Sequence, residues 1–221
     1  MSVALIPVKR LTESKSRLLP HLPDAKRQAL TLAMLEDLIE CLTNTKGLDR
    51  IGVTTPDETV AEHARKAGAE ILMRPEPGLN AALEEGIARM RPRADEAMMI
   101  VLGDVAGAVP TDFEALLGDA ATQRERGIWL APSSDGGTSA LVQRPPGVIP
   151  CCFGRDSADR HHAAAREARV PFHSIPLRSL AIDLDQPEDL DAFRATEGGG
   201  ARTRALLAEI LGEFDAPSGL T

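Results

Sequence analysis

The chain has 221 residues, of which 43% are hydrophobic and 26% are charged, proportions that predict an ordinary globular protein with one sizeable core. It lacks an apolar run of the roughly 18 residues that span a membrane and the basic start and long apolar centre of a secretory signal, so we expect a cytoplasmic protein without a membrane segment. A formal net charge of −8 argues against nucleic acid as a partner, because proteins that bind a phosphate backbone usually carry a basic face.

Short apolar runs alternate with amphipathic helical patterns through the first half of the chain. In order, they predict a strand at 3–8, a helix at 24–42, a strand at 50–54, a helix at 57–67, a strand at 69–73, a helix at 80–90, a strand at 97–102 and a helix that begins near Thr111. Repeated strand–helix units of this kind are typical of an α/β fold with a mostly parallel sheet. The run at 97–102 is apolar throughout, which indicates a central strand buried on both faces.

The alternation loosens in the second half. Here the patterns predict a hairpin-like insertion with strands at 127–131 and 139–144, a helix at 157–168, strands near 171–175 and 180–184, and a helix from Pro187. We expect residues 1–196 to form a single domain, followed by a glycine linker at 197–200 and a C-terminal helix and tail at 201–221. The apolar stripe of that last helix predicts packing on the body of the protein or on a second copy in a homodimer.

Two carboxylates stand two residues apart on the expected strand at 180–184 and just beyond it. Because side chains alternate along a strand, Asp183 and Asp185 are expected to point the same way. Neighbouring carboxylates repel unless a proton or a cation lies between them, and hard oxygen ligands suit Mg²⁺ held together with substrate phosphates. The alternative is that these acids belong to the start of the helix at Pro187, where acidic residues are common.

A third acid, Asp104, follows the buried strand at 97–102. Ligands of open α/β sheets bind just outside the carboxyl ends of the strands, so Asp104 could converge with Asp183 and Asp185 at one edge of the sheet. Three such carboxylates would supply the protein ligands of a cation, with phosphate oxygens and water in the remaining positions. The pattern therefore predicts metal-dependent nucleotide or phosphate chemistry.

The connection after the first expected strand concentrates positive charge in an otherwise acidic chain. Lys9, Lys15 and Arg17 lie there, and cations at this place can hold a triphosphate and offset the charge of a leaving pyrophosphate. A solvated surface loop is the alternative. The chain has neither a GxxxxGK[ST] nor a GxGxxG motif, so a P-loop and a dehydrogenase-type dinucleotide site are not supported.

Three further positions combine small or hydroxyl residues with a helix start or a turn. Gly78 and Asn80 open one expected helix, where Asn80 could contact a base or cap the helix. Thr138 follows two glycines, a pattern suited to an anion or to a tight turn. Gly154 and Ser157 stand at the start of another helix, where Ser157 could bind an anion or act as an N-cap.

Several motifs occur in one order along the chain: IPVK with KSRL behind it, GLNAAL, GD after the fourth strand, GGTSAL, FGxxS followed by a helical histidine, and DLDQPEDL. From about Ile6 to Leu190 they resemble the 2-phospho-L-lactate guanylyltransferase family, MobA-like nucleotidyltransferases of deazaflavin coenzyme F(420) biosynthesis. The resemblance implies a three-layer α/β/α, Rossmann-like nucleotidyltransferase fold and transfer of GMP from GTP to a small phosphorylated carboxylic acid. The acid would be 2-phospho-L-lactate, phosphoenolpyruvate or 3-phospho-D-glycerate, and an unstable product would pass to a transferase that acts on a deazaflavin precursor.

The resemblance also implies roles for individual residues. By the family's pattern, Asp104, Asp183 and Asp185 would hold Mg²⁺; Lys9, Lys15 and Arg17 would face the GTP phosphates; Gly78 and Asn80 would lie by the nucleoside; and Thr138, Gly154 and Ser157 would receive the phospho-acid. An acceptor phosphate oxygen would attack the α-phosphorus in line, without a protein nucleophile.

The chain departs from the family's pattern at three places: Val105-Ala106-Gly107 follows Asp104, Ser139 follows Thr138, and Ala158 follows Ser157. The first change is in the metal loop and the other two are on the acceptor side, so the residues do not separate the three acids. Alternatives are a related nucleotidyltransferase that acts on a sugar phosphate or molybdenum cofactor, and a non-catalytic nucleotide-binding homologue. Retention of all three aspartates argues against the latter.

Overall fold

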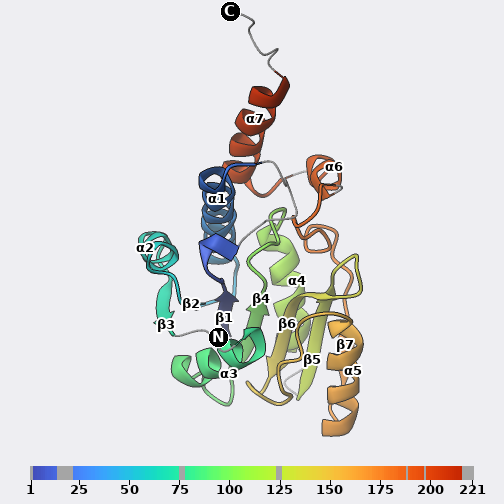
Figure 1. The fold of residues 1–221 in the computed structure, drawn as a ribbon. Helices are drawn as coiled ribbons and strands as arrows, with labels where there is room; N and C mark the ends of the chain where they lie inside the picture. Colours follow the sequence, from blue (N-terminus) through green and yellow to red (C-terminus); the bar gives the residue numbers. More distant parts are fainter. Residues whose placement is uncertain are drawn as a thin grey trace, which may run out of the picture.

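A computed structural model describes residues 2–13, 22–74, 78–122, 126–187, 189–196 and 198–215. Seven strands form one sheet in the order β3-β2-β1-β4-β6-β5-β7 (Figure 1). The strands are β1 (Ser2–Pro7), β2 (Arg50–Thr55), β3 (Glu70–Met73), β4 (Ala97–Val101), β5 (Gly127–Pro132), β6 (Thr138–Arg144) and β7 (Phe172–Ser174). Neighbouring strands are parallel except where β6 lies antiparallel between β4 and β5, which confirms the mostly parallel α/β sheet.

Helices cover both faces of the sheet. They are α1 (Asp24–Thr43), α2 (Glu58–Lys66), α3 (Leu79–Met90), α4 (Pro110–Thr122), α5 (Ser157–Ala168), α6 (Asp189–Arg194) and α7 (Ala201–Asp215), with a short 3₁₀ turn at Leu11–Glu13. Ala4 and Ile6 of β1 pack with α1, α2 and α4, whereas Val3 and Leu5 pack with α3 and α5. This alternation along one strand gives the three-layer arrangement.

The strands expected at 127–131 and 139–144 form a hairpin, but this hairpin is part of the main sheet and not an insertion outside it. Its second strand, β6, pairs with β4 in the middle of the sheet, with Val101 opposite Ala140. Because β6 runs antiparallel to β4, its amino end lies at the same edge as the carboxyl ends of the parallel strands. Thr138, the first residue of β6, is thereby placed at the edge where a ligand is expected.

The strand expected at 180–184 is absent from this described stretch, and that prediction was wrong. Residues 180–185, called the crossing segment below, run across the edge of the sheet and are hydrogen-bonded at two separate points. Ser134 N–H donates to the Ala181 carbonyl, and Leu184 N–H donates to the Asp104 carbonyl. Leu184 packs with α1, α6 and α7. Its alternating apolar residues therefore anchor an irregular crossing rather than one face of a strand.

The C-terminal helix packs on the body of this same chain. A small apolar cluster joins α1, the loop after β4, the crossing segment, α6 and α7; its buried members are Leu30, Met34, Ala106, Leu184, Leu190, Phe193 and Leu207. The glycines before α7 are needed for close packing, because a Cβ at Gly199 or Gly200 would lie 2.5 Å from the carbonyl oxygen of Gly107 or Ala106. The predicted frayed tail, 216–221, lies outside the described residues, and no described helix is long and apolar enough to cross a membrane.

Candidate nucleotide and acceptor site

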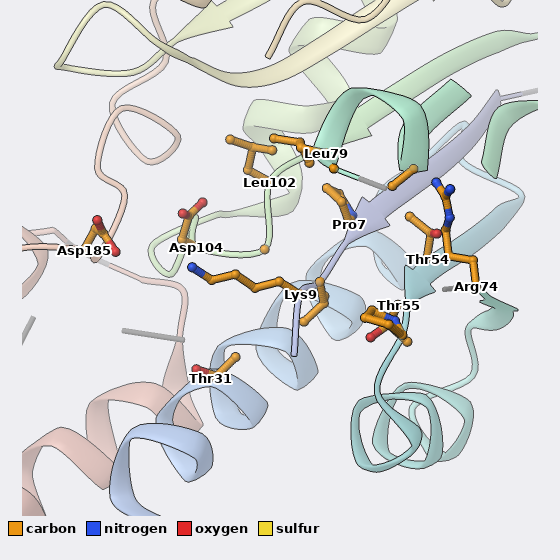
Figure 2. A pocket seen from close by; sticks show the side chains of 15 residues that line it. Pro7, Lys9, Thr31, Thr54, Thr55, Arg74, Leu79, Leu102, Asp104 and Asp185 are labelled. Carbon is orange, nitrogen blue, oxygen red and sulfur yellow. The ribbon is translucent and has the colours of Figure 1, made fainter. Parts of the chain in front are cut away.

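A cavity of about 370 Å³ opens at the carboxyl ends of β1, β2 and β4 (Figure 2). Its walls come from five parts of the fold: the strand ends, the start of α3, one turn of α1, the loop after β4 and the crossing segment. The lining residues are Pro7, Val8, Lys9, Thr31, Thr54, Thr55, Pro56, Arg74, Gly78, Leu79, Ala82, Leu102, Gly103, Asp104 and Asp185. The cavity is thus where the topology of an open α/β sheet places a ligand.

One end of the cavity is lined by the acidic side chains of Asp104 and Asp185 and by the basic side chain of Lys9. Figure 2 shows the Lys9 side chain extending toward Asp104, with Asp185 on the far side. The hydrogen bond from Leu184 N–H to the Asp104 carbonyl, 3.1 Å long, joins the two loops that carry these acids. Lys15 and Arg17, the other expected phosphate contacts, lie outside the described residues.

Asp183 differs from Asp185 because the segment that carries them is not a strand. Asp185 lines the cavity and Asp183 is not among its lining residues, so the two acids have different surroundings. Burial, and then the neighbouring charge of Asp104, raise the pKa of Asp183 to about 6. Asp183 and Asp104 are therefore close enough to repel each other.

The acidic end fits a hard cation, although not as a ready-made three-ligand cage. In the described part of the chain, no three His, Cys, Asp or Glu side chains are grouped so as to hold one ion. Mg²⁺ is commonly held by only one or two carboxylates together with substrate phosphates. Asp104 and Asp185 both line this cavity, and the charge of Asp104 acts on the nearby Asp183. These carboxylates are the type of donor that Mg²⁺ uses.

The two residues expected beside the nucleoside have different environments. Gly78 lines the cavity and precedes α3 with a φ of 93°, a conformation that favours glycine. Asn80 does not line it: its Nδ2 donates to the Phe153 carbonyl at 3.1 Å, and its Oδ1 accepts from Phe153 N–H at 2.8 Å. Both ends of the amide are thus engaged, so Asn80 joins α3 to the loop before α5 and does not cap the helix.

Two of the three expected acceptor residues meet in a buried cluster. Ser157 Oγ lies 2.9 Å from Thr138 Oγ1, to which it donates, and both residues are buried. Gly154 is exposed, with a φ of 115°, at the turn before α5. None of the three lines this cavity, but the bond from Leu102 N–H to the Ser139 carbonyl places Thr138 beside the cavity wall.

A buried histidine that sequence reasoning did not assign to the site completes this cluster. His161 Nε2 accepts from Cys152 N–H at 3.0 Å, so the proton resides on Nδ1, which lies 3.1 Å from Thr138 Oγ1. Burial, and then the charge of Arg160, lower the pKa of His161 to about 4. The usable signal was its spacing: His161 is four residues after Ser157 and therefore on the same face of a helix.

The buried histidine predicts a pH dependence of stability. The unfolded chain takes up a proton at His161 near pH 6.5, whereas the folded protein resists it until about pH 4. This group's contribution is therefore complete above about pH 6.5 and is lost as the pH falls toward 4, by about 3 kcal/mol in total. In urea titrations between pH 7.5 and 4, we expect His161→Gln to remove this part of the slope, while His162→Gln, at the exposed neighbouring position, keeps it. Equal slopes in all three proteins would contradict the assignment.

Comparisons with known proteins found similar sequences over most of the chain. A family model described as "Guanylyl transferase CofC like" matches residues 2–215. The chain is 37% identical to a phosphoenolpyruvate guanylyltransferase of Sphaerobacter thermophilus over 90% of this chain and 96% of that protein. It is 34% identical to a 3-phospho-D-glycerate guanylyltransferase of Phenylobacterium zucineum over 98% of this chain and 100% of that protein.

Solved structures with the same fold are much more distant in sequence. A cytidylyltransferase from Leptospira borgpetersenii has a TM-score of 0.60 at 12% identity, over 100% of this chain and 98% of that one. A CMP:2-keto-3-deoxy-manno-octonic acid synthetase complexed with CTP has a TM-score of 0.59 at 14% identity, over 95% and 100%. These likenesses confirm the nucleotidyltransferase fold.

Proposed function

Because this chain belongs to the CofC-like guanylyl transferase family, we propose that it transfers GMP from GTP to a small phosphorylated carboxylic acid and releases pyrophosphate. The observation that carries the proposal is the cavity at the sheet edge, which has Lys9, Asp104 and Asp185 at one end and whose wall at Leu102 is hydrogen-bonded to Ser139, the residue after Thr138. Phosphoenolpyruvate and 3-phospho-D-glycerate are the first acceptors to test, since relatives named for both are matched over most of their length.

The residues support an in-line displacement without a protein nucleophile. A phosphate oxygen of the acceptor attacks the α-phosphorus of GTP, the bond from that phosphorus to the bridging oxygen of pyrophosphate breaks, and pyrophosphate leaves with the electron pair. The Lys9 ammonium group offsets negative charge on the triphosphate. The buried cluster of Thr138, Ser157 and His161 fixes the start of β6 and of α5 at the same sheet edge, where we propose that the acceptor binds.

We propose that Asp104 and Asp185, with Asp183 beside them, hold Mg²⁺. When bound, the ion would neutralise charge on the transferring and leaving phosphates. Treatment with excess EDTA is therefore expected to abolish pyrophosphate release, and added Mg²⁺ to restore it, in a coupled colorimetric assay. Full activity after EDTA treatment and dialysis against metal-free buffer would remove the metal from this account.

In the cell, the product would be an activated phospho-acid joined to GMP. We propose that it passes to a transferase acting on a deazaflavin precursor, as an early step of coenzyme F(420) formation. Such a mixed phosphoric anhydride is reactive, so direct hand-over would limit its hydrolysis.

The proposed function is tested by measuring pyrophosphate release from GTP, ATP and CTP with each of the three phospho-acids and, for comparison, with a sugar phosphate and a molybdenum cofactor precursor. The expected result is release with GTP and at least one acid, and little with the other nucleotides. Release only with a sugar phosphate or a molybdenum cofactor precursor would identify a different nucleotidyltransferase. Binding of GTP without release in any pairing would identify a non-catalytic homologue.

A further inference from the structure

The end of the cavity opposite the acids contains a buried arginine that no step above uses. Arg74 directly follows β3, and its backbone N–H donates to the Thr55 carbonyl at 3.2 Å. Its side chain is only 6% exposed and lines the cavity. Figure 2 shows Arg74 beside Thr54, with Pro7 between them and the acidic end.

The guanidinium group is only partly satisfied by the protein. Its Nη2 lies 3.0 Å from Glu85 Oε2 of α3, but among the described residues Nε and Nη1 have no hydrogen-bond acceptor, although both are buried. The hydroxyl of Thr54, also buried, has no partner among them either. Buried donors without acceptors are costly and uncommon in native proteins, so this group points to a ligand that supplies acceptors.

The walls around these donors suit a flat ring. Pro7, Leu79 and Ala82 line the same cavity and present apolar surface. A nucleotide whose phosphates lie near Lys9 would place its base at the Arg74 end. The O6 and N7 atoms of guanine are both acceptors, whereas adenine presents an N6 amino group, a donor, where guanine presents O6.

We propose that Arg74, together with Thr54, binds the acceptor edge of the guanine ring and selects GTP over ATP. This inference rests on the proposed function, because it assigns the base of the nucleotide used in that reaction. Glu85 holds the guanidinium in place through Nη2 and leaves the other two nitrogens for the base.

The test compares Arg74→Met and Arg74→Lys with Arg89→Gln as the matched control. Arg89 also lies near Glu85, at 3.7 Å, but does not line the cavity. Kd values for the magnesium complexes of GTP, ITP and ATP would be measured by calorimetry, with kcat/KM for pyrophosphate release. ITP keeps O6 and N7 and lacks only the 2-amino group.

For the wild type and Arg89→Gln, we expect GTP and ITP to bind similarly and ATP much more weakly. Arg74→Met should weaken GTP and ITP together by about 10- to 100-fold and change ATP by less than about 3-fold. Arg74→Lys should recover part of the loss, since it restores a donor. An unchanged GTP to ATP ratio in Arg74→Met would overturn the proposal.

A replacement variant is available if Arg74→Met does not fold, as judged by circular dichroism. In that case Thr54→Val is measured instead. A selective loss of GTP and ITP binding supports the proposal, and unchanged binding of all three nucleotides overturns it. If the wild type prefers GTP in binding but releases no pyrophosphate with any acid, the proposed reaction fails while the assignment of Arg74 is still tested. If the wild type binds GTP and ATP equally, the assignment itself fails.

Discussion

Replacing Asp104 with asparagine is expected to lower kcat for pyrophosphate release by at least about 100-fold, the usual effect of removing one preorganised charge-stabilising group. Asparagine has nearly the same shape as aspartate, and the hydrogen bond from Leu184 N–H is to the backbone carbonyl of residue 104. The substitution should therefore leave the backbone conformation of this loop unchanged. The lost charge is the one that faces Lys9 and would hold the cation. Steady-state rates with GTP and the best acceptor measure the effect, and Asp183→Asn should cause a comparable loss.

The control for this substitution is Asp191→Asn on α6. Its side chain is 90% exposed and pairs only with Arg194 among the described contacts, an exposed ion pair of small energetic value. Asp191→Asn is expected to keep the wild-type rate. If Asp104→Asn also kept it, the acidic end of the cavity would not be the transfer centre.

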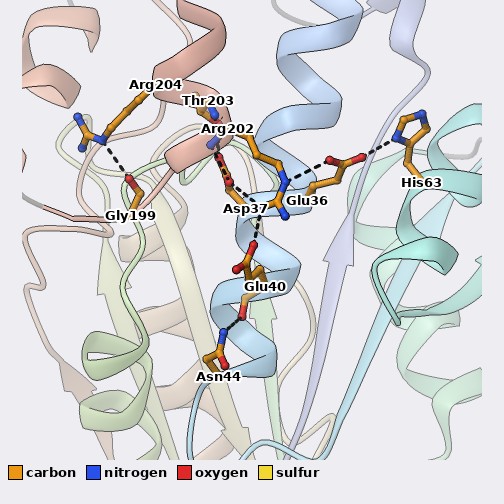
Figure 3. Close-up of polar contacts among 9 residues, drawn as sticks. All are labelled: Glu36, Asp37, Glu40, Asn44, His63, Gly199, Arg202, Thr203 and Arg204. Carbon is orange, nitrogen blue, oxygen red and sulfur yellow. Dashed lines mark hydrogen bonds and ion pairs between the residues drawn. The ribbon is translucent and has the colours of Figure 1, made fainter.

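The second large effect is on stability, at the junction between α1 and α7 (Figure 3). Asp37 is buried in α1 and accepts from the backbone N–H groups of Arg202 and Thr203, from the Thr203 hydroxyl and from Arg202 Nη1. It therefore satisfies two amides in the first turn of α7, as a helix cap does, but from another helix. Asp37→Ala should lower the free energy of unfolding in urea by about 3 kcal/mol, the combined loss of a cap and of buried charge-assisted hydrogen bonds.

Glu40→Ala is the matched control, because Glu40 also pairs with Arg202 but its side chain is 58% exposed. It should cost less than about 1 kcal/mol. Hydrogen exchange should locate the Asp37→Ala effect in α7 and in the cluster around Leu184 and Phe193. A uniform small loss for both variants would mean that Asp37 does not hold the C-terminal helix.

The sequence was sufficient for elements whose pattern is local. Helix α1 has its apolar stripe at 3.6-residue spacing, and β4 is apolar throughout because it is buried on both faces. The position of β6 between β4 and β5 depends on its pairing with β4, a strand distant in the sequence. No short-range sequence pattern predicts that pairing. The prediction of a strand at 180–184 was wrong for a related reason. Leu180 and Leu184 are buried in different apolar clusters, and the alternation of apolar residues alone cannot distinguish an irregular segment of this kind from a strand.

The candidate site shows the same division. Asp104 was predictable because it follows a buried strand, and Ser157 because it begins a helix. The bonds of Asn80 could not be predicted, since its partner, the Phe153 backbone, is 73 residues away in the chain. Arg74 was missed because what distinguishes it is burial beside Glu85, which only the folded structure brings together; for His161 the spacing from Ser157 was the local signal, but its contact with Thr138 was not predictable.

The most direct test of the central claim is a ³¹P NMR spectrum of the purified protein incubated with GTP, Mg²⁺ and phosphoenolpyruvate or 3-phospho-D-glycerate. The account predicts the appearance of free pyrophosphate together with a new pair of coupled signals, from a phosphoric anhydride bond between GMP and the acid. A spectrum that showed only GDP and inorganic phosphate, or unchanged GTP with either acid and with 2-phospho-L-lactate, would contradict it.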